Sequence, residues 1–124
     1  MRSKPNLTDA WQTRARQNLR AAALLTARHP PLVFPAISRL YYGVFHAVLA
    51  ALWRAGKRPK DLHGDVWCAC ERLQPGLGNA LWDLYKWRRR ADYATGPIQL
   101  EQARALVAEY TTLCASIGIH PGES

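Results

Sequence analysis

The chain has 124 residues, 48% of them hydrophobic, and 17 Lys/Arg against 9 Asp/Glu give a formal net charge of +8. This length fits one domain with a modest core, and five Trp, five Tyr and two Phe exclude a disordered chain. No apolar run reaches the roughly 20 residues that cross a bilayer, and the first five residues lack the apolar stretch of a secretory signal. We therefore expect a cytoplasmic protein without a membrane segment.

Proline and glycine divide the chain into five segments rich in Ala, Leu, Arg and Glu, which favour helix. The predicted helices cover residues 8–28, 35–55, 62–73, 77–93 and 97–117. Thr8 or Asn6 can cap the first helix, and Pro35 suits the first position of the second. The expected fold is all-α, a single-domain up-and-down bundle of about five helices over residues 1–124.

The positive charge is concentrated at the beginning of the chain. Residues 1–60 contain eleven Lys/Arg and one acid, whereas residues 61–124 contain six Lys/Arg and eight acids. The surplus is compatible with an acidic partner, either nucleic acid or an anionic protein. A phosphate-backbone track is one interpretation and a solvated charged face is the other. The track would consist of Arg14, Arg16, Arg20 and Arg28 of the first helix, with Arg54, Lys57, Arg58 and Lys60 after the second.

The second predicted helix has two unusual faces. One is a core stripe at helical spacing, made of Ile37, Leu40, Tyr41, Val44, Val48 and Leu52. The opposite face holds small and aromatic residues with one Arg/His pair two turns apart: Arg39, Tyr42, Gly43, His46, Ala50 and Trp53. A solvent face would be rich in Glu, Lys and Gln. We therefore expect this helix to pack on both sides, against another helix or a second subunit.

The third helix does not suggest a metal site. Cys68 and Cys70 point in different directions on a helix, so with His63 they provide at most three poorly arranged ligands. Together with Cys114 they form an odd set of cysteines and no disulfide framework, as in a reduced compartment. We expect no metal and no cofactor.

The fourth helix carries an arginine where a core residue is expected. Its apolar stripe, Leu77, Leu81 and Leu84, continues at the same spacing to Arg88 and Asp92. An arginine in register with a core stripe is costly unless it is paired, and Asp92 can pair with it. The neighbouring Arg89 and Arg90 point elsewhere, and Trp87 between Lys86 and Arg88 is the tryptophan most expected to be exposed.

Three segments resemble one family in order and spacing. They are AISRLYYGVFHA at residues 36–47, LHGDV at residues 62–66 and LYKWRRRADY at residues 84–93. They resemble the HEPN superfamily (higher eukaryote and prokaryote nucleotide-binding domains), in the branch with S-R-x-Y-Y-x-x-F-H-A and R-x-x-A-D-Y signatures. The resemblance covers about residues 36 to 93.

The resemblance implies a helical bundle, commonly a homodimer, that acts on RNA. Several members of the superfamily are toxins encoded beside a minimal nucleotidyltransferase antitoxin. In nuclease members, an R-x4–6-H motif on the late helix acts on the scissile phosphate without a metal. Here the late motif reads Arg88-x4-Tyr93, and the literal R-x6-H of this chain runs from Arg39 to His46. The implied catalytic set is Arg88, Asp92, Tyr93, Arg39 and His46.

Each of these residues also has a purely structural interpretation. Arg88 and Asp92 can be a buried ion pair or a phosphate-binding arginine oriented by its carboxylate. Tyr93 is favoured as a core residue, with a phosphate contact or a nucleotide acceptor as the functional reading. Arg39 and His46 can form an interhelical hydrogen-bond pair or provide phosphate binding and acid–base chemistry.

Two functional hypotheses follow. The first is a dimeric, metal-independent endoribonuclease, the toxin-like component of a toxin–antitoxin or defence system. The alternative is a non-catalytic RNA-binding, nucleotide-binding or adaptor module that partners a nucleotidyltransferase or another protein.

Overall fold

A computed structural model describes residues 7–59, 64–93 and 96–121. Over these residues it contains five helices and no strand: α1 (Leu7–Ala27), α2 (Val33–Arg54), α3 (Gly64–Leu73), α4 (Leu77–Tyr93) and α5 (Leu100–Ser116). The prediction of an all-α bundle is confirmed. Every described helix boundary lies within three residues of its predicted position, while residues 62 and 63 lie outside the described ranges.

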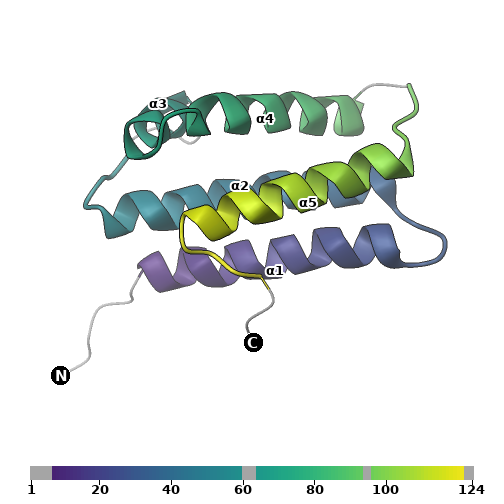
Figure 1. Ribbon diagram of the computed structural model, residues 1–124, viewed down its shortest axis with the longest axis horizontal. Coiled ribbons are helices and arrows are strands. Elements are labelled where there is room, and N and C mark those ends of the chain that lie inside the picture. Colours follow the sequence, from purple (N-terminus) through teal and green to yellow (C-terminus); the bar gives the residue numbers. More distant parts are fainter. Residues whose placement is uncertain (1–6, 60–63, 94–95, 122–124) are drawn as a thin grey trace.

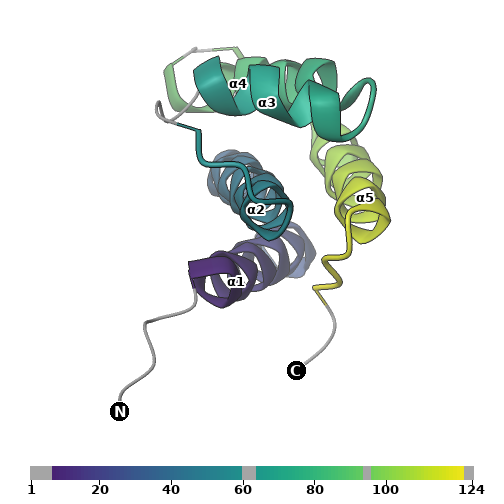
Figure 2. The same ribbon diagram turned by 90° about the vertical axis from the view of Figure 1, so that its left-hand side faces the viewer.

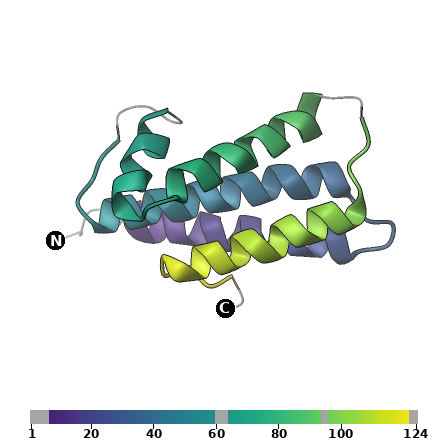
Figure 3. The same ribbon diagram turned by 45° about the horizontal axis from the view of Figure 1, so that its top comes forward.

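The four long helices lie along the long axis of the molecule and alternate in direction along the chain (Figures 1 and 3). The short α3 packs beside the beginning of α4. Figure 2, seen from one end, places α2 between α1 and the layer formed by α3 and α4. Helix α5 covers one side of α2, and contacts join α2 to each of the other four helices. On the side away from α5, helices α1, α2 and α4 form one face.

Helix α2 is the core of the bundle because both of its long faces are packed. Each residue of its predicted core stripe is at most 1% exposed. On the other side, α1 approaches so closely that a Cβ on Gly43 would lie 2.9 Å from Leu19 Cγ and 3.1 Å from the Leu19 backbone nitrogen. Packing on the Gly43 side is therefore confirmed, with α1 as the partner, while Arg39 of the same face is exposed.

The starts of α2 and α5 differ from their predicted positions for local reasons. Helix α2 begins at Val33, two residues early, which leaves Pro35 within the first turn, where its missing N–H removes no helical hydrogen bond. Helix α5 begins at Leu100 rather than at Pro97, because Gln99 and Gln102 form a capping box. The Gln99 backbone nitrogen donates to Gln102 Oε1 at 3.0 Å. Helix α1 begins at Leu7, so Thr8 lies inside it and Asn6 is outside the described ranges.

A tight turn sets the position of α4 against α3. Gly76 has φ +88°, which favours glycine, and its backbone nitrogen donates to both carboxylate oxygens of Glu71, at 2.6 and 2.9 Å. A Cβ on Gly78 would lie 2.7 Å from the carbonyl oxygen of Trp67. The two helices are therefore in near backbone contact at this end.

Among the described helices, α2 is long and apolar enough to cross a membrane by length and composition. The central helices of globular bundles share this property, and most of α2 is buried by its neighbours.

Candidate functional site

Arg88 is held in a cage of aromatic rings. Its guanidinium carbon lies 5.0, 5.4 and 5.9 Å from the ring centroids of Tyr42, Tyr41 and Tyr85, within the range of cation–π attraction. Its side chain is 17% exposed, and its Nε lies 3.2 Å from Asp92 Oδ2. That nitrogen is buried and not directed at the oxygen as a hydrogen bond, so the contact is an ion pair. The predicted pairing of Arg88 with Asp92 is confirmed.

Asp92 connects α4 to α2. Ser38 Oγ donates to Asp92 Oδ1 at 2.5 Å, while the other carboxylate oxygen faces Arg88. The Asp92 side chain is 28% exposed, so the pair is largely but not wholly removed from water. Within the cage, burial raises the pKa of Tyr41 well above its usual range, which keeps this phenol neutral.

A second cluster joins α1 to α2 through Asn18, which the sequence did not indicate. The Arg39 Nη1 donates to Asn18 Oδ1 at 3.4 Å, and Asn18 Nδ2 lies 3.4 Å from His46 Nδ1. With the amide as donor, Nδ1 is the acceptor and the ring proton is assigned to Nε2. Arg39 and His46 are thus coupled through one asparagine side chain and not directly.

His46 is neutral at physiological pH. Its ring stacks on Trp11, with centroids 5.4 Å apart and planes 15° apart. Burial, and secondarily the positive charge of Arg14, lowers the pKa of His46 to about 4. A neutral imidazole can accept a proton, but this pKa is far below the value that best suits acid–base catalysis at pH 7.

The two clusters are neighbours along α2. The Tyr42 ring lies 5.0 Å from the Arg88 guanidinium carbon and 6.3 Å from the His46 ring. We call the whole set the polar stripe; it consists of Ser38, Arg39, Tyr42 and His46 of α2, Trp11 and Asn18 of α1, and Arg88 and Asp92 of α4. Four of the five predicted catalytic residues therefore lie in this one set.

Tyr93 is the exception, and its expected burial is wrong. It is 72% exposed, and its ring lies 5.4 Å from the guanidinium carbon of Arg89, not in the cage around Arg88. As the last residue of α4, it lies beyond the buried stripe, whose final member there is Ala91.

The predicted basic track does not form one face of α1. At 100° per residue, Arg14 lies about 200° from Arg16 and 240° from Arg20. Arg14 sits 5.3 Å from the Trp11 ring centroid, beside the polar stripe, whereas Arg20 is exposed elsewhere on the helix. Arg16 is half-buried, with an Nε that has no hydrogen-bond partner.

Lys57, Arg58 and Lys60 of the track follow α2 in the chain. Lys57 and Arg58 are exposed there. Lys60 falls outside the described residues, as does His63.

The cysteines differ in their surroundings. Cys68 is exposed, whereas Cys70 and Cys114 are buried. Burial raises the pKa of each buried thiol to about 12. The described parts of the chain contain no group of three or more His, Cys, Asp or Glu side chains that could hold a metal ion.

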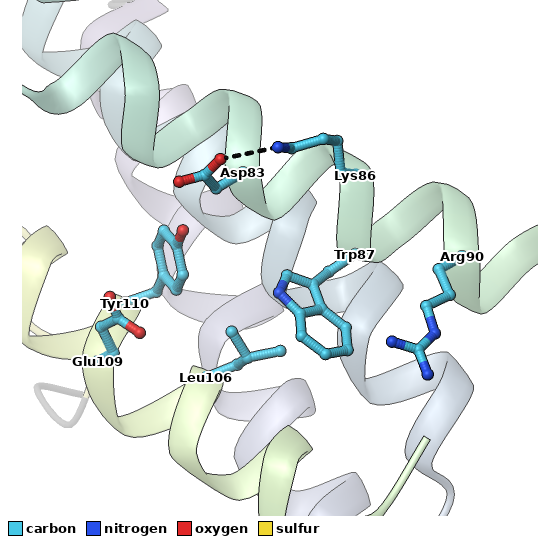
Figure 4. A pocket seen from close by; sticks show the side chains of 7 residues that line it. All are labelled: Asp83, Lys86, Trp87, Arg90, Leu106, Glu109 and Tyr110. Carbon is cyan, nitrogen blue, oxygen red and sulfur yellow. Dashed lines mark ion pairs between the residues drawn. The ribbon is translucent and has the colours of Figure 1, made fainter. Parts of the chain in front are cut away.

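A separate pocket of about 400 Å³ lies between α4 and α5 (Figure 4). Trp87 lines it, with the Arg90 guanidinium carbon 5.1 Å from the ring centroid, so the expectation that Trp87 is the most exposed tryptophan is wrong. Trp82 is the large exposed tryptophan, at 43%. Arg90 also donates to the Pro97 carbonyl and points away from the cage, as predicted. Arg89 lies beside the Tyr93 ring and also interacts with Tyr85, the outer ring of the cage, so for Arg89 the prediction is wrong.

Comparisons of the chain with models of protein families, with curated proteins and with solved structures find no match. The chemistry of the polar stripe is therefore interpreted from its own geometry.

Proposed function

We propose that this protein is a HEPN-like, RNA-directed protein and that the polar stripe contacts the RNA backbone. The observation that supports this most directly is the Arg88 cage, adjoined by the Arg39–Asn18–His46 cluster. A buried ion pair alone adds little stability, so a caged arginine next to a second, exposed arginine calls for a functional reason.

Arginine suits this role because its planar fork can contact two phosphate oxygens at once. Arg39 is exposed and oriented by Asn18, so it can reach a phosphate with little loss of side-chain freedom. Arg88 is 17% exposed, and Asp92 and three rings fix its position. Tyr42 lies beside Arg88, and His46 and Trp11 follow it, so the stripe also offers aromatic surface.

A metal-independent endoribonuclease is the catalytic form of this proposal, and the Arg39–Asn18–His46 cluster favours it. Cleavage requires one proton to leave a ribose 2′-hydroxyl and one to reach the departing oxygen. A neutral His46 can accept the proton of the 2′-hydroxyl. It is the single histidine that one chain places in the polar stripe, so it would take part in both proton transfers. The same His46, protonated by the first transfer, can return the proton to the departing oxygen, so the two transfers balance. A homodimer and a regulating nucleotidyltransferase antitoxin are the assembly and partner that the resemblance implies.

The adaptor alternative uses the same residues differently. In it, the stripe binds RNA, a nucleotide or a nucleotidyltransferase without any cleavage. The low pKa of His46 favours this form over the catalytic one, because its conjugate acid is almost absent at pH 7. Binding and cleavage must therefore be measured separately.

The test uses a labelled RNA pool, with affinity from fluorescence anisotropy and cleavage from gels run in the presence of EDTA. Arg39→Gln should weaken binding and reduce the slope of log affinity against log salt by about 1, as expected for one lost phosphate contact. Arg104→Gln, at an exposed arginine of α5 outside the polar stripe, is the matched control. Undetectable RNA binding by the wild type would reject the RNA proposal.

Cleavage that survives both His46→Gln and Arg39→Gln would reject the catalytic assignment. Co-purification with a stable protein partner, with intact RNA throughout, is the result expected for the adaptor form.

A further inference from the structure

A second pocket, of about 320 Å³, lies between the segment after α2 and helix α3. Its lining includes three basic side chains, Lys57, Arg58 and Arg72, and one carboxylate, Asp65. Cys68 forms part of its wall. The described residues that line the pocket therefore carry an excess of two formal positive charges.

Arg58 is held in place before any ligand arrives. Its guanidinium carbon lies 4.0 Å from the Trp53 ring centroid, and its Nη1 donates to the carbonyl oxygens of Trp53 and Lys57, each at 3.0 Å. These contacts use one of the three guanidinium nitrogens and leave the other donors of the fork available. An orientation that is fixed in advance reduces the entropy lost on binding.

The α3 wall of the pocket follows helical spacing. Asp65, Cys68 and Arg72 are separated by three and four residues, so they lie on one face of the helix. Arg72 is exposed, in the last turn of α3. Charges from two separate segments of the chain thus line the same hollow.

We propose that this pocket binds a phosphomonoester, the terminal phosphate of an RNA strand or of a nucleotide. A phosphomonoester carries a charge of about −1.5 to −2 at pH 7 and three strong acceptor oxygens, which matches the excess charge and the arginine donors. A phosphate inside an RNA chain carries one charge, so it matches the excess positive charge of the pocket less well than a terminal phosphate does.

The pocket also lies in line with the polar stripe. Trp53, on which Arg58 rests, follows His46 by seven residues, which is two helical turns and about 10 Å along the same side of α2. An RNA strand on the stripe would bring its end close to the pocket. This placement of RNA depends on the proposed function, whereas binding of a nucleotide does not.

Cys68 provides a direct assay, because it is the exposed thiol in the pocket wall while Cys70 and Cys114 are buried with raised pKa values. The rate of alkylation by the neutral reagent iodoacetamide is measured on the full chain at constant ionic strength. AMP, at ten times its dissociation constant, should slow the reaction about tenfold, and adenosine should not. Inorganic phosphate should also protect the thiol.

Two arms distinguish the source of the phosphate. If RNA ends are the ligand, an oligonucleotide with a 5′-phosphate should protect Cys68 at lower concentration than AMP does, and the 5′-hydroxyl form should not match it. Protection by AMP with no difference between the oligonucleotides assigns the pocket to nucleotides.

Arg72→Gln should abolish protection in every arm, and Arg104→Gln should leave it unchanged. Arg39→Gln separates this proposal from the RNA-binding one, because it should alter RNA affinity without affecting protection by AMP. Unchanged alkylation with millimolar AMP, inorganic phosphate and the 5′-phosphorylated oligonucleotide would overturn the proposal. So would equal protection in wild type and Arg72→Gln.

Discussion

Replacement of Asp92 by asparagine tests whether the Arg88 cage is truly desolvated. The substitution removes the negative charge but keeps the shape and an oxygen that can still accept from Ser38 Oγ. Breaking a fully buried ion pair costs about 3 to 5 kcal/mol. Here the Arg88 and Asp92 side chains are 17% and 28% exposed, and the three tyrosine rings still attract the cation. We therefore expect Asp92→Asn to lower the free energy of unfolding by about 2 to 3 kcal/mol.

The same helix provides the control. Asp83 pairs with Lys86 at 3.1 Å, but these side chains are 60% and 57% exposed, so Asp83→Asn should cost about 0.5 kcal/mol or less. Urea titrations followed by tryptophan fluorescence should give an unfolding midpoint about 1 to 2 M lower for Asp92→Asn, with an unchanged slope. Equal midpoints for the two variants would refute the reasoning. Arg88→Met combined with Asp92→Asn should recover part of the loss, since no buried charge then remains unpaired.

Three further predictions concern packing, pH and one hydrogen bond. Gly78→Ala would set a Cβ 2.7 Å from the Trp67 carbonyl oxygen. Despite alanine's better helix propensity, it should lower the unfolding midpoint in urea, which corresponds to a loss of about 1 to 3 kcal/mol in the free energy of unfolding. The pKa of His46 is about 4 in the folded protein and about 6.5 in the unfolded chain, so between these pH values acid protonates the unfolded chain first. Acidification through this range should therefore lower the free energy of unfolding, by about 1 to 2 kcal/mol after a discount for partial exposure. His46→Gln should flatten that loss when unfolding is compared at pH 7 and pH 4.5, and an unchanged pH dependence would contradict it. Tyr110→Phe removes a hydroxyl that donates to the Ala80 carbonyl at 2.6 Å. Thermal denaturation should show a loss of about 1 kcal/mol in the free energy of unfolding, and an unchanged stability would show that this hydrogen bond does not stabilise the fold.

Burial and pairing could be predicted from the sequence where they depend on positions within a single helix. The core stripe of α2 and the continuation of the α4 stripe to Arg88 follow from helical spacing, so burial and pairing with Asp92 were predictable. Tyr93 shows the limit of the same reasoning, because it is the terminal residue of α4 and has no neighbouring helix to cover it.

The parts of the site that join different helices were not predictable in this way. Asn18 lies 21 and 28 residues from Arg39 and His46, and nothing in its local sequence shows that it meets both. The poor helix propensity of Asn18 was the available signal, and it is weak because other polar residues surround it in α1. Ser38 and the tyrosine cage similarly depend on how α2 packs on α4.

The central position of α2 determines how the polar stripe can respond to a ligand. Its backbone is held by contacts with all four other helices, so the side chains it presents cannot shift far without disturbing the whole bundle. A ligand would therefore bind to side chains that are already in place, and most of the conformational entropy lost on association would be that of the ligand. Free and occupied forms of the protein should then be nearly superimposable over α1, α2 and α4, with differences confined to side-chain rotamers.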